Sequence, residues 1–218
     1  MKIKTYDAEK ISKPENTIVA VDEDFIYNDT KTFFLKQFLD KDSKSKYAFT
    51  VNNIHNKNYF NIKKDGQTKI IYDIYKKPIL NIRHSMIFPH IAFYKGNEDK
   101  EMIASVQPDT TIVEFYNQFT KKQEILNILN DKFNCSCGIF YGKEKEGAPM
   151  ICKIREIMDA NTFITYCDKE YTIEISEGVD IVIIIALAIS FAEMNFITRR
   201  DRIKDSDPYN IDPNSQFY

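Results

Sequence analysis

The sequence predicts a mainly β protein: a closed antiparallel barrel of about twelve strands around one central apolar helix near the C-terminus. Short runs rich in β-branched and aromatic residues recur roughly every ten residues, as they do in sandwiches and barrels. One stretch without a charge, residues 181–192, breaks that rhythm and is long enough for a helix. With 218 residues, 43% of them hydrophobic, the chain can fill the core of one large β domain.

The chain divides into three parts by composition. Residues 1–16 are polar and are predicted to form a loose N-terminal arm. Residues 17–200 form the predicted barrel domain, with the central helix at about residues 179–198. Residues 201–218 form a polar C-terminal tail, in which two Asp-Pro pairs oppose any regular element. The middle shows no linker and no convincing repeat, so we expect a single domain.

The predicted strands are rich in β-branched and aromatic residues and are separated by polar clusters. In chain order they cover residues 32–38, 47–51, 59–62, 70–75, 79–85, 90–94, 101–106, 111–115, 135–141, 150–157, 162–166 and 170–175. Alternation is clearest at residues 171–175, where apolar and polar side chains take turns, so that one face meets a core. Asp65-Gly66 lies between two such runs and predicts a tight hairpin turn. Residues 123–129 fit either a strand or a helix.

The predicted helix contains the uncharged sequence IVIIIALAISFA at residues 181–192. Asp180 precedes this run and lies near the positive end of the helix dipole, whereas Arg199, Arg200 and Arg202 lie near its negative end. A helix that is apolar on every side must be surrounded by lipid or by protein. A membrane span needs about 20 apolar residues, and Glu193 interrupts this run earlier. The sequence therefore favours enclosure by the barrel.

Several segments, in their order along the chain, resemble the LURP-one-related family, part of a wider group with tubby C-terminal-like and phospholipid-scramblase domains. The strongest match is YTIEISEGVD at residues 171–180, which runs straight into the apolar helix. Further matches are Phe49-Thr50-Val51, Phe60-Asn61-Ile62, Asp65-Gly66 and residues 74–80 and 148–155. The resemblance covers roughly residues 20–200 and implies a twelve-stranded barrel with a central helix.

The resemblance implies less about activity, because members of the wider group include plant defence-associated proteins, phosphoinositide-binding transcription regulators and membrane scramblases. We expect a non-enzymatic binding or scaffold module whose ligand is a phosphoinositide or a protein. The alternative is a scramblase-like membrane-associated protein with the apolar helix inserted in lipid. The chain departs from scramblases, since it has neither their Pro-rich N-terminal arm nor their Cys-rich run.

Four basic residues are the candidates for contact with a lipid headgroup: Lys76, Lys77, Arg199 and Arg200. Lys63 and Lys64, which precede the predicted Asp65-Gly66 turn, extend the set. If these residues converge at one end of the barrel, several charge-assisted hydrogen bonds could hold a phosphoinositide or a phosphoprotein. Scattered around a solvated rim instead, the same lysines only discourage edge pairing.

The cysteines and histidines form no pattern that predicts a catalytic or metal site. Cys135, Cys137, Cys152 and Cys167 show no metal-ligand spacing and are expected to be reduced residues of the barrel wall. The three histidines, His55, His84 and His90, are scattered, and no GxSxG elbow accompanies them. We therefore expect no enzyme activity, no cofactor and no metal.

The charges nearly balance. Thirty Lys and Arg against 32 Asp and Glu give a formal net charge of −2, so we expect no nucleic-acid partner. Residues 1–13 carry charges and lack the apolar core of a secretory signal. We expect a cytoplasmic protein, or one peripheral to a membrane, with no transmembrane span.

Overall fold

The computed structural model describes residue 6 and residues 8–38, 47–84, 91–106, 111–131, 135–157 and 169–206, with side chains described as far as Met194. The strands are β1 Lys31–Gln37, β2 Phe49–Asn53, β3 Asn58–Asp65, β4 Thr68–Tyr72, β5 Pro78–His84, β6 Ile91–Lys95, β7 Met102–Val106, β8 Ile112–Asn117, β9 Lys122–Asn130, β10 Ser136–Tyr141, β11 Met150–Ile157 and β12 Lys169–Ile175. One long helix, α1 Ile181–Ser206, and two short 3-10 helices, Glu23–Phe25 and Glu144–Glu146, complete the described elements.

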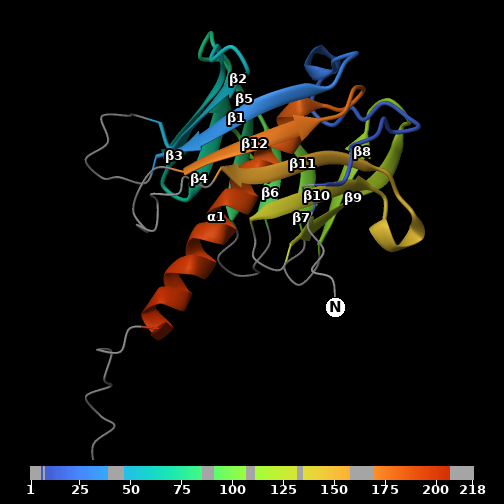
Figure 1. Cartoon of the computed structure of the whole chain (residues 1–218). Helices are drawn as coiled ribbons and strands as arrows, with labels where there is room; N and C mark the ends of the chain where they lie inside the picture. The colour runs from blue at the N-terminus through green and yellow to red at the C-terminus, as the bar shows by residue number, and fades with distance from the viewer. Residues whose placement is uncertain are drawn as a thin grey trace, which may run out of the picture.

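The strands form one closed barrel in which each strand pairs with its neighbours in the chain (Figure 1). All pairs are antiparallel, and the ring closes where β1 pairs with β12, from Lys31 opposite Ile175 to Gln37 opposite Lys169. Closure leaves no strand with an unpaired edge, which is how such sheets avoid edge-to-edge aggregation. The predicted fold class, a mainly β closed barrel with one C-terminal helix, is confirmed.

The alternation expected from the sequence places apolar side chains inside the barrel. In β12, Tyr171, Ile173 and Ile175 are buried, whereas the intervening Thr172 and Glu174 are partly exposed. Phe33 and Leu35 of β1 follow the same rule. One face of each strand thus supplies the outer half of the core.

One open assignment is decided by the structure, and two predicted boundaries need correction. Residues 123–129, which the sequence left open, belong to strand β9. The β3–β4 turn consists of Gly66 and Gln67, because Asp65 still pairs with Thr68; Gly66 supplies the positive φ of +59° that the turn requires. The strand predicted at 70–75 ends at Tyr72 as β4. The strand predicted at residues 162–166 lies outside the described residues.

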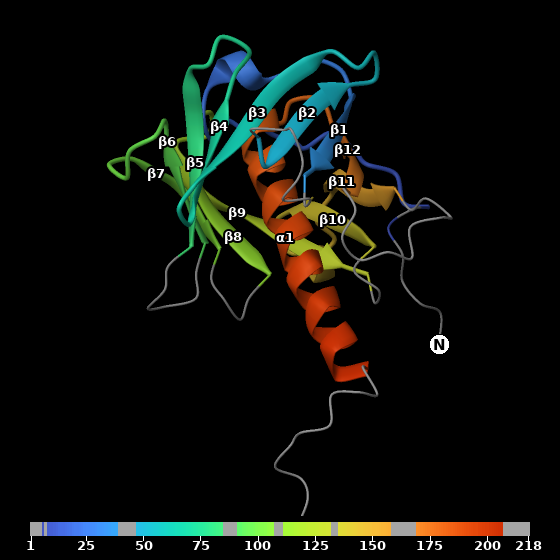
Figure 2. The ribbon, with the colours of Figure 1, turned by 90° about the vertical axis from the view of Figure 1, so that its left-hand side faces the viewer.

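Helix α1 runs along the inside of the barrel and supplies the inner half of the core. Its side chains from Ile181 to Ala192 are all buried, and the Phe191 ring meets the Tyr171 ring edge-on, with centroids 6.2 Å apart. The helix ends at Ser206, beyond the predicted end near residue 198, and its C-terminal part leaves the barrel (Figure 2). No helix within the described residues is long and apolar enough to cross a membrane.

The two ends of the barrel differ. At the end where α1 begins, which we call the capped end, residues 17–22 cross the opening. Ile18 forms a parallel bridge with Val179, and the N–H of Val19 donates to Oδ1 of Asn117 at 3.1 Å. At the opposite end, the mouth, α1 leaves the barrel. Tyr6 is buried against Phe140 and Met150 on the outer wall, an anchoring that differs from the loose arm expected over residues 1–16.

Candidate functional site

A pocket opens at the mouth, between α1 and the ends of the strands around it. Its volume is about 530 Å³, within the usual range for small-molecule sites. The mouth pocket is lined by Gln37, Phe38, Ala48, Phe49, Lys64, Gln67, Lys69, His84, Ile91, Glu193 and Met194. The walls are thus partly apolar and partly polar, and both kinds of side chain come from strands separated in the sequence.

An ion pair lies at the inner side of the mouth pocket. Lys69 Nζ is 2.8 Å from Oε2 of Glu193, and His84 Nε2 is 3.6 Å from the same oxygen. Burial by itself raises the pKa of the Glu193 carboxyl, but the neighbouring His84 and the charge of Lys69 outweigh burial and lower that pKa below its usual value. Glu193 is therefore ionised at neutral pH and balances the charge of Lys69.

Two other polar side chains of the mouth pocket, Gln37 and Lys64, lack such a partner among the described residues. The Gln37 side chain is 5% exposed, and its Oε1 has no hydrogen-bond partner among the described residues. Lys64 lies directly opposite Lys69 in the β3–β4 pair, and no ion pair joins it to any described residue. The pocket therefore offers one buried acceptor and one positive charge that the described part of the chain does not use.

A second candidate surface lies at the capped end, where two turns share one geometry. In the β2–β3 turn, Asn53 Oδ1 accepts hydrogen bonds from the N–H groups of His55 and Lys57, both at 2.9 Å. In the β4–β5 turn, Asp73 Oδ1 accepts from Tyr75 at 2.9 Å and from Lys77 at 2.8 Å. These Asx-type bonds fix both loops locally.

The two turns carry the same types of residue at the same positions. Each turn has an isoleucine after the Asx residue, then a ring residue, a residue of positive φ and a lysine: Asn53-Ile54-His55-Asn56-Lys57 and Asp73-Ile74-Tyr75-Lys76-Lys77. This repeat is visible in the sequence, but the sequence analysis missed it because an isolated five-residue match carries little weight. Only the matching hydrogen bonds show that the two segments are equivalent.

We use the name tip patch for the exposed side chains of the two turns taken together: Ile54, His55, Lys57, Ile74, Tyr75, Lys76 and Lys77. Ile54, Ile74 and Tyr75 are 63%, 48% and 83% exposed, and thus place three large side chains in solvent on these two turns. Because β3 pairs with β4, the two turns project from the same end of neighbouring hairpins (Figure 2).

The structure separates the four predicted basic candidates into two groups. Lys76 and Lys77 lie in the tip patch at the capped end. Arg199 and Arg200 belong to the part of α1 that leaves by the mouth, and their side chains lie outside the description. The two pairs therefore do not converge at one barrel end, because the β4–β5 turn and the C-terminal half of α1 belong to opposite ends.

The cysteines and histidines are placed as follows. The Cys135 side chain is half-buried, and Cys137 and Cys152 are buried thiols whose pKa burial raises well above the usual value. Cys167 and His90 lie outside the described residues. Within the described residues, no group of three or more His, Cys, Asp or Glu side chains could hold a metal ion.

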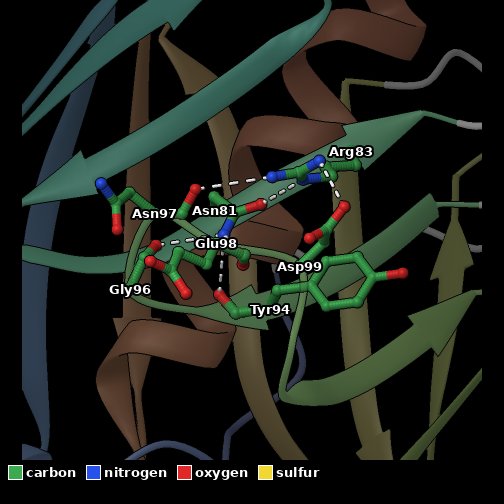
Figure 3. A network of polar contacts seen from close by, with 7 residues as sticks. All are labelled: Asn81, Arg83, Tyr94, Gly96, Asn97, Glu98 and Asp99. Atoms are coloured by element: carbon green, nitrogen blue, oxygen red, sulfur yellow. Dashed lines mark hydrogen bonds and ion pairs between the residues drawn. The ribbon is translucent and has the colours of Figure 1, made fainter.

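A polar network on the outer wall looks like a site but is internally satisfied (Figure 3). The Asn81 amide donates to the carbonyl oxygens of Gly96 at 3.1 Å and Glu98 at 2.9 Å, and its Oδ1 accepts from Arg83 Nε at 2.9 Å. Arg83 also pairs with Asp99 at 3.1 Å. Since the polar groups of the Asn81 and Arg83 side chains have partners from the chain, the network fastens the β6–β7 loop onto β5.

A closed antiparallel barrel with a helix through its centre defines the class of tubby-like barrels. Within that class, the chain belongs to the LURP-one-related family, whose model matches residues 31–192. The resemblance that the sequence suggested is thereby confirmed.

Among solved structures, the chain is similar to the X-ray structure of a protein from Arabidopsis thaliana. The TM-score is 0.58, and the alignment covers 81% of this chain and 98% of the Arabidopsis chain. Sequence identity is 13%, so this likeness shows the fold alone. No curated protein matches the chain.

Proposed function

We propose that this chain is a non-enzymatic binding module that docks on an anionic membrane surface through the tip patch. Lys57, Lys76 and Lys77 would contact lipid phosphates, those of a phosphoinositide headgroup included. Ile54, Ile74 and Tyr75 would enter the interface between headgroups and acyl chains. The observation that carries this proposal is the exposure of two isoleucines and a tyrosine beside three lysines on two turns of the same geometry.

Two physical terms support this docking. Each lysine near an anionic leaflet contributes about 1 kcal/mol, and apolar burial adds about 25 cal/mol for each Å² removed from water. The ordering cost is small because Asn53 and Asp73 already fix the backbone of the two turns. Such a surface potential belongs to the cytoplasmic leaflet, so the proposal places the protein in the cytoplasm, peripheral to a membrane.

Neither rival function gains a supporting observation. An enzyme would need catalytic groups in a pocket, but the charged pair of the mouth pocket, Lys69 and Glu193, is neutralised internally. A scramblase-like insertion of α1 would have to open the closed barrel, since residues 181–192 lie inside it. A binding role fits the family and the surface together.

The test is sedimentation of the purified chain with vesicles of three compositions, each at low and high salt. The vesicles contain phosphatidylcholine alone, phosphatidylcholine with phosphatidylserine, or phosphatidylcholine with a phosphoinositide. We expect salt-sensitive binding to the two anionic compositions only. The double variant Lys76→Gln/Lys77→Gln should bind about tenfold more weakly or worse.

A matched control removes two lysines from another loop at the capped end. Lys143 and Lys145 alternate with glutamates in the β10–β11 loop, and Lys143 pairs with Glu146 at 3.2 Å. Lys143→Gln/Lys145→Gln therefore changes the net charge equally and should leave binding unchanged. Equal losses in both double variants would reduce the effect to net charge and contradict the proposal. Absence of binding to every vesicle would also contradict it and leave a protein as the ligand to seek.

A further inference from the structure

We propose that the mouth pocket is a separate binding site for a small phosphate monoester that carries an apolar chain of moderate length, an alkyl phosphate. The anionic oxygens would lie near Lys64, and the chain would lie against the apolar wall. This site is independent of the tip patch, because the two lie at opposite ends of the barrel.

Gln37 shows that the pocket is incomplete without a ligand. The preceding inward residues of β1, Phe33 and Leu35, are apolar, and alternation brings Gln37 to the same inner face. Its Oε1 is buried without a partner among the described residues. A buried acceptor without a donor destabilises a fold, so a hydrophobic residue would serve the wall better. A phosphate monoester that retains one P–OH group would donate a hydrogen bond to this oxygen, whereas a carboxylate could only accept one.

The positive charge of the pocket is the second argument. Lys64 and Lys69 are directly opposite each other on two paired strands, an arrangement that is unfavourable for like charges. Glu193 balances Lys69 at 2.8 Å, whereas the exposed Lys64 has no ion pair with any residue that the structure describes. A ligand anion beside Lys64 removes this repulsion and forms a charge-assisted hydrogen bond.

The apolar lining decides between a simple anion and an amphiphile. Among the described residues, the apolar part of the pocket consists of Phe49 of β2, Ile91 of β6, Met194 of α1, and Phe38 and Ala48, which flank β1 and β2. Inorganic phosphate would leave these side chains in water, whereas an alkyl chain would cover them. A volume of about 530 Å³ accommodates a headgroup together with a chain of moderate length.

The test is isothermal titration of the full chain with four probes below their micelle-forming concentrations. At about pH 6, decyl phosphate carries a charge, an O–H donor and an apolar chain. Decanoate lacks the donor, decanol lacks the charge, and inorganic phosphate lacks the chain. We expect decyl phosphate to bind and each of the other three to bind at least about tenfold more weakly, a difference of about 1.4 kcal/mol.

Three variants assign the binding to this pocket. Lys64→Gln should weaken decyl phosphate binding about tenfold. Gln37→Leu should weaken it too, while raising the melting temperature of the free protein because a buried unpaired oxygen is removed. Lys63→Gln, on the outward face of the same strand, is the matched control and should bind as wild type does. Vesicle binding should be the same for Lys64→Gln and wild type.

Several results would overturn the inference. They are failure of decyl phosphate to bind, equal binding by all variants, or binding of inorganic phosphate as tight as that of decyl phosphate. Binding of decanol as tight as that of decyl phosphate would exclude a role for Lys64, and equally tight binding of decanoate would exclude a role for Gln37. A Gln37→Leu protein that melts below wild type would show that Gln37 serves the barrel wall, which removes the first argument.

Discussion

Asp180 joins two segments that are far apart in the sequence. Its Oδ2 accepts hydrogen bonds from the N–H groups of Ala20, Val21 and Asp22, at 3.2, 2.6 and 3.3 Å. Its Oδ1 accepts from the N–H of Val182 at 2.9 Å, in the first turn of α1. The carboxyl group thus caps the helix and holds the segment that closes the barrel.

The same carboxyl group makes stability depend on pH. Burial raises the pKa of Asp180 from 3.8 to about 6, although the hydrogen bonds from the backbone act in the opposite direction. The folded state therefore binds a proton more tightly than the unfolded state does between about pH 4 and pH 6. The stabilising contribution of Asp180 is complete below this window and is lost as the pH rises through it.

Asp180→Asn tests both roles of the residue. An amide nitrogen in place of Oδ2 leaves three backbone N–H groups without an acceptor, so we expect the unfolding free energy to fall by about 2 kcal/mol at neutral pH. The difference between wild type and variant should grow, on the order of 3 kcal/mol, as the pH falls from 6 to 4. Urea unfolding at several pH values measures this. A difference that stays constant with pH would contradict the assigned pKa.

At the scale of the element, α1 shows why an uncharged helix can belong to a barrel. Strands surround the enclosed part of α1 on every side, so this part has no polar face. Ser190, the polar exception in this part, returns its hydroxyl to the carbonyl of Ala186 at 3.0 Å. The polar face begins only at Glu193, where the helix reaches the mouth.

A lysine placed at two depths along α1 distinguishes the enclosed part from the part at the mouth. Ile184 is fully buried, so Ile184→Lys introduces an ammonium group without a partner and should prevent folding. Met194, which is 43% exposed at the mouth, is the matched position, and Met194→Lys should remain folded. Circular dichroism and size-exclusion chromatography measure the outcome. A folded Ile184→Lys protein of normal stability would refute the enclosed helix.

At the scale of the whole molecule, the antiparallel order of the strands decides what each end of the barrel carries. Successive turns alternate between the two ends, so the β2–β3 and β4–β5 turns share the capped end, and the β3–β4 turn lies at the mouth. Docking through the tip patch therefore turns the mouth pocket away from the membrane. The two proposed ligands would be bound at the same time without contact.

This orientation can be tested with a single tryptophan, because the chain has none. Tyr75→Trp places the reporter in the tip patch, and Gln67→Trp places it at the mouth. We expect the emission of Tyr75→Trp to shift to shorter wavelength on anionic vesicles, since the ring enters the interface. The emission of Gln67→Trp should not change. A shift at the mouth position instead would mean that the barrel docks by its other end.

The barrel and its helix could be predicted from the amino-acid sequence, because both depend on patterns that are local. Alternation within segments such as residues 171–175 defines the inner face of a strand, and twelve uncharged residues at 181–192 define an element that must be enclosed. The sequence could not assign residues 123–129, since their apolar residues fit two periods. Nor did it place the end of α1, where charged residues continue the helix to Ser206.

The tertiary structure alone decided which polar residues share a surface. Lys76 and Arg199 are both basic, yet strand direction places one at the capped end and the other in the helix segment leaving the mouth. Gln37 has no distinguishing sequence context, and only the pairing of β1 brings its buried oxygen to the mouth pocket. Such placement depends on register and closure, which are set by contacts between distant strands and leave no local pattern.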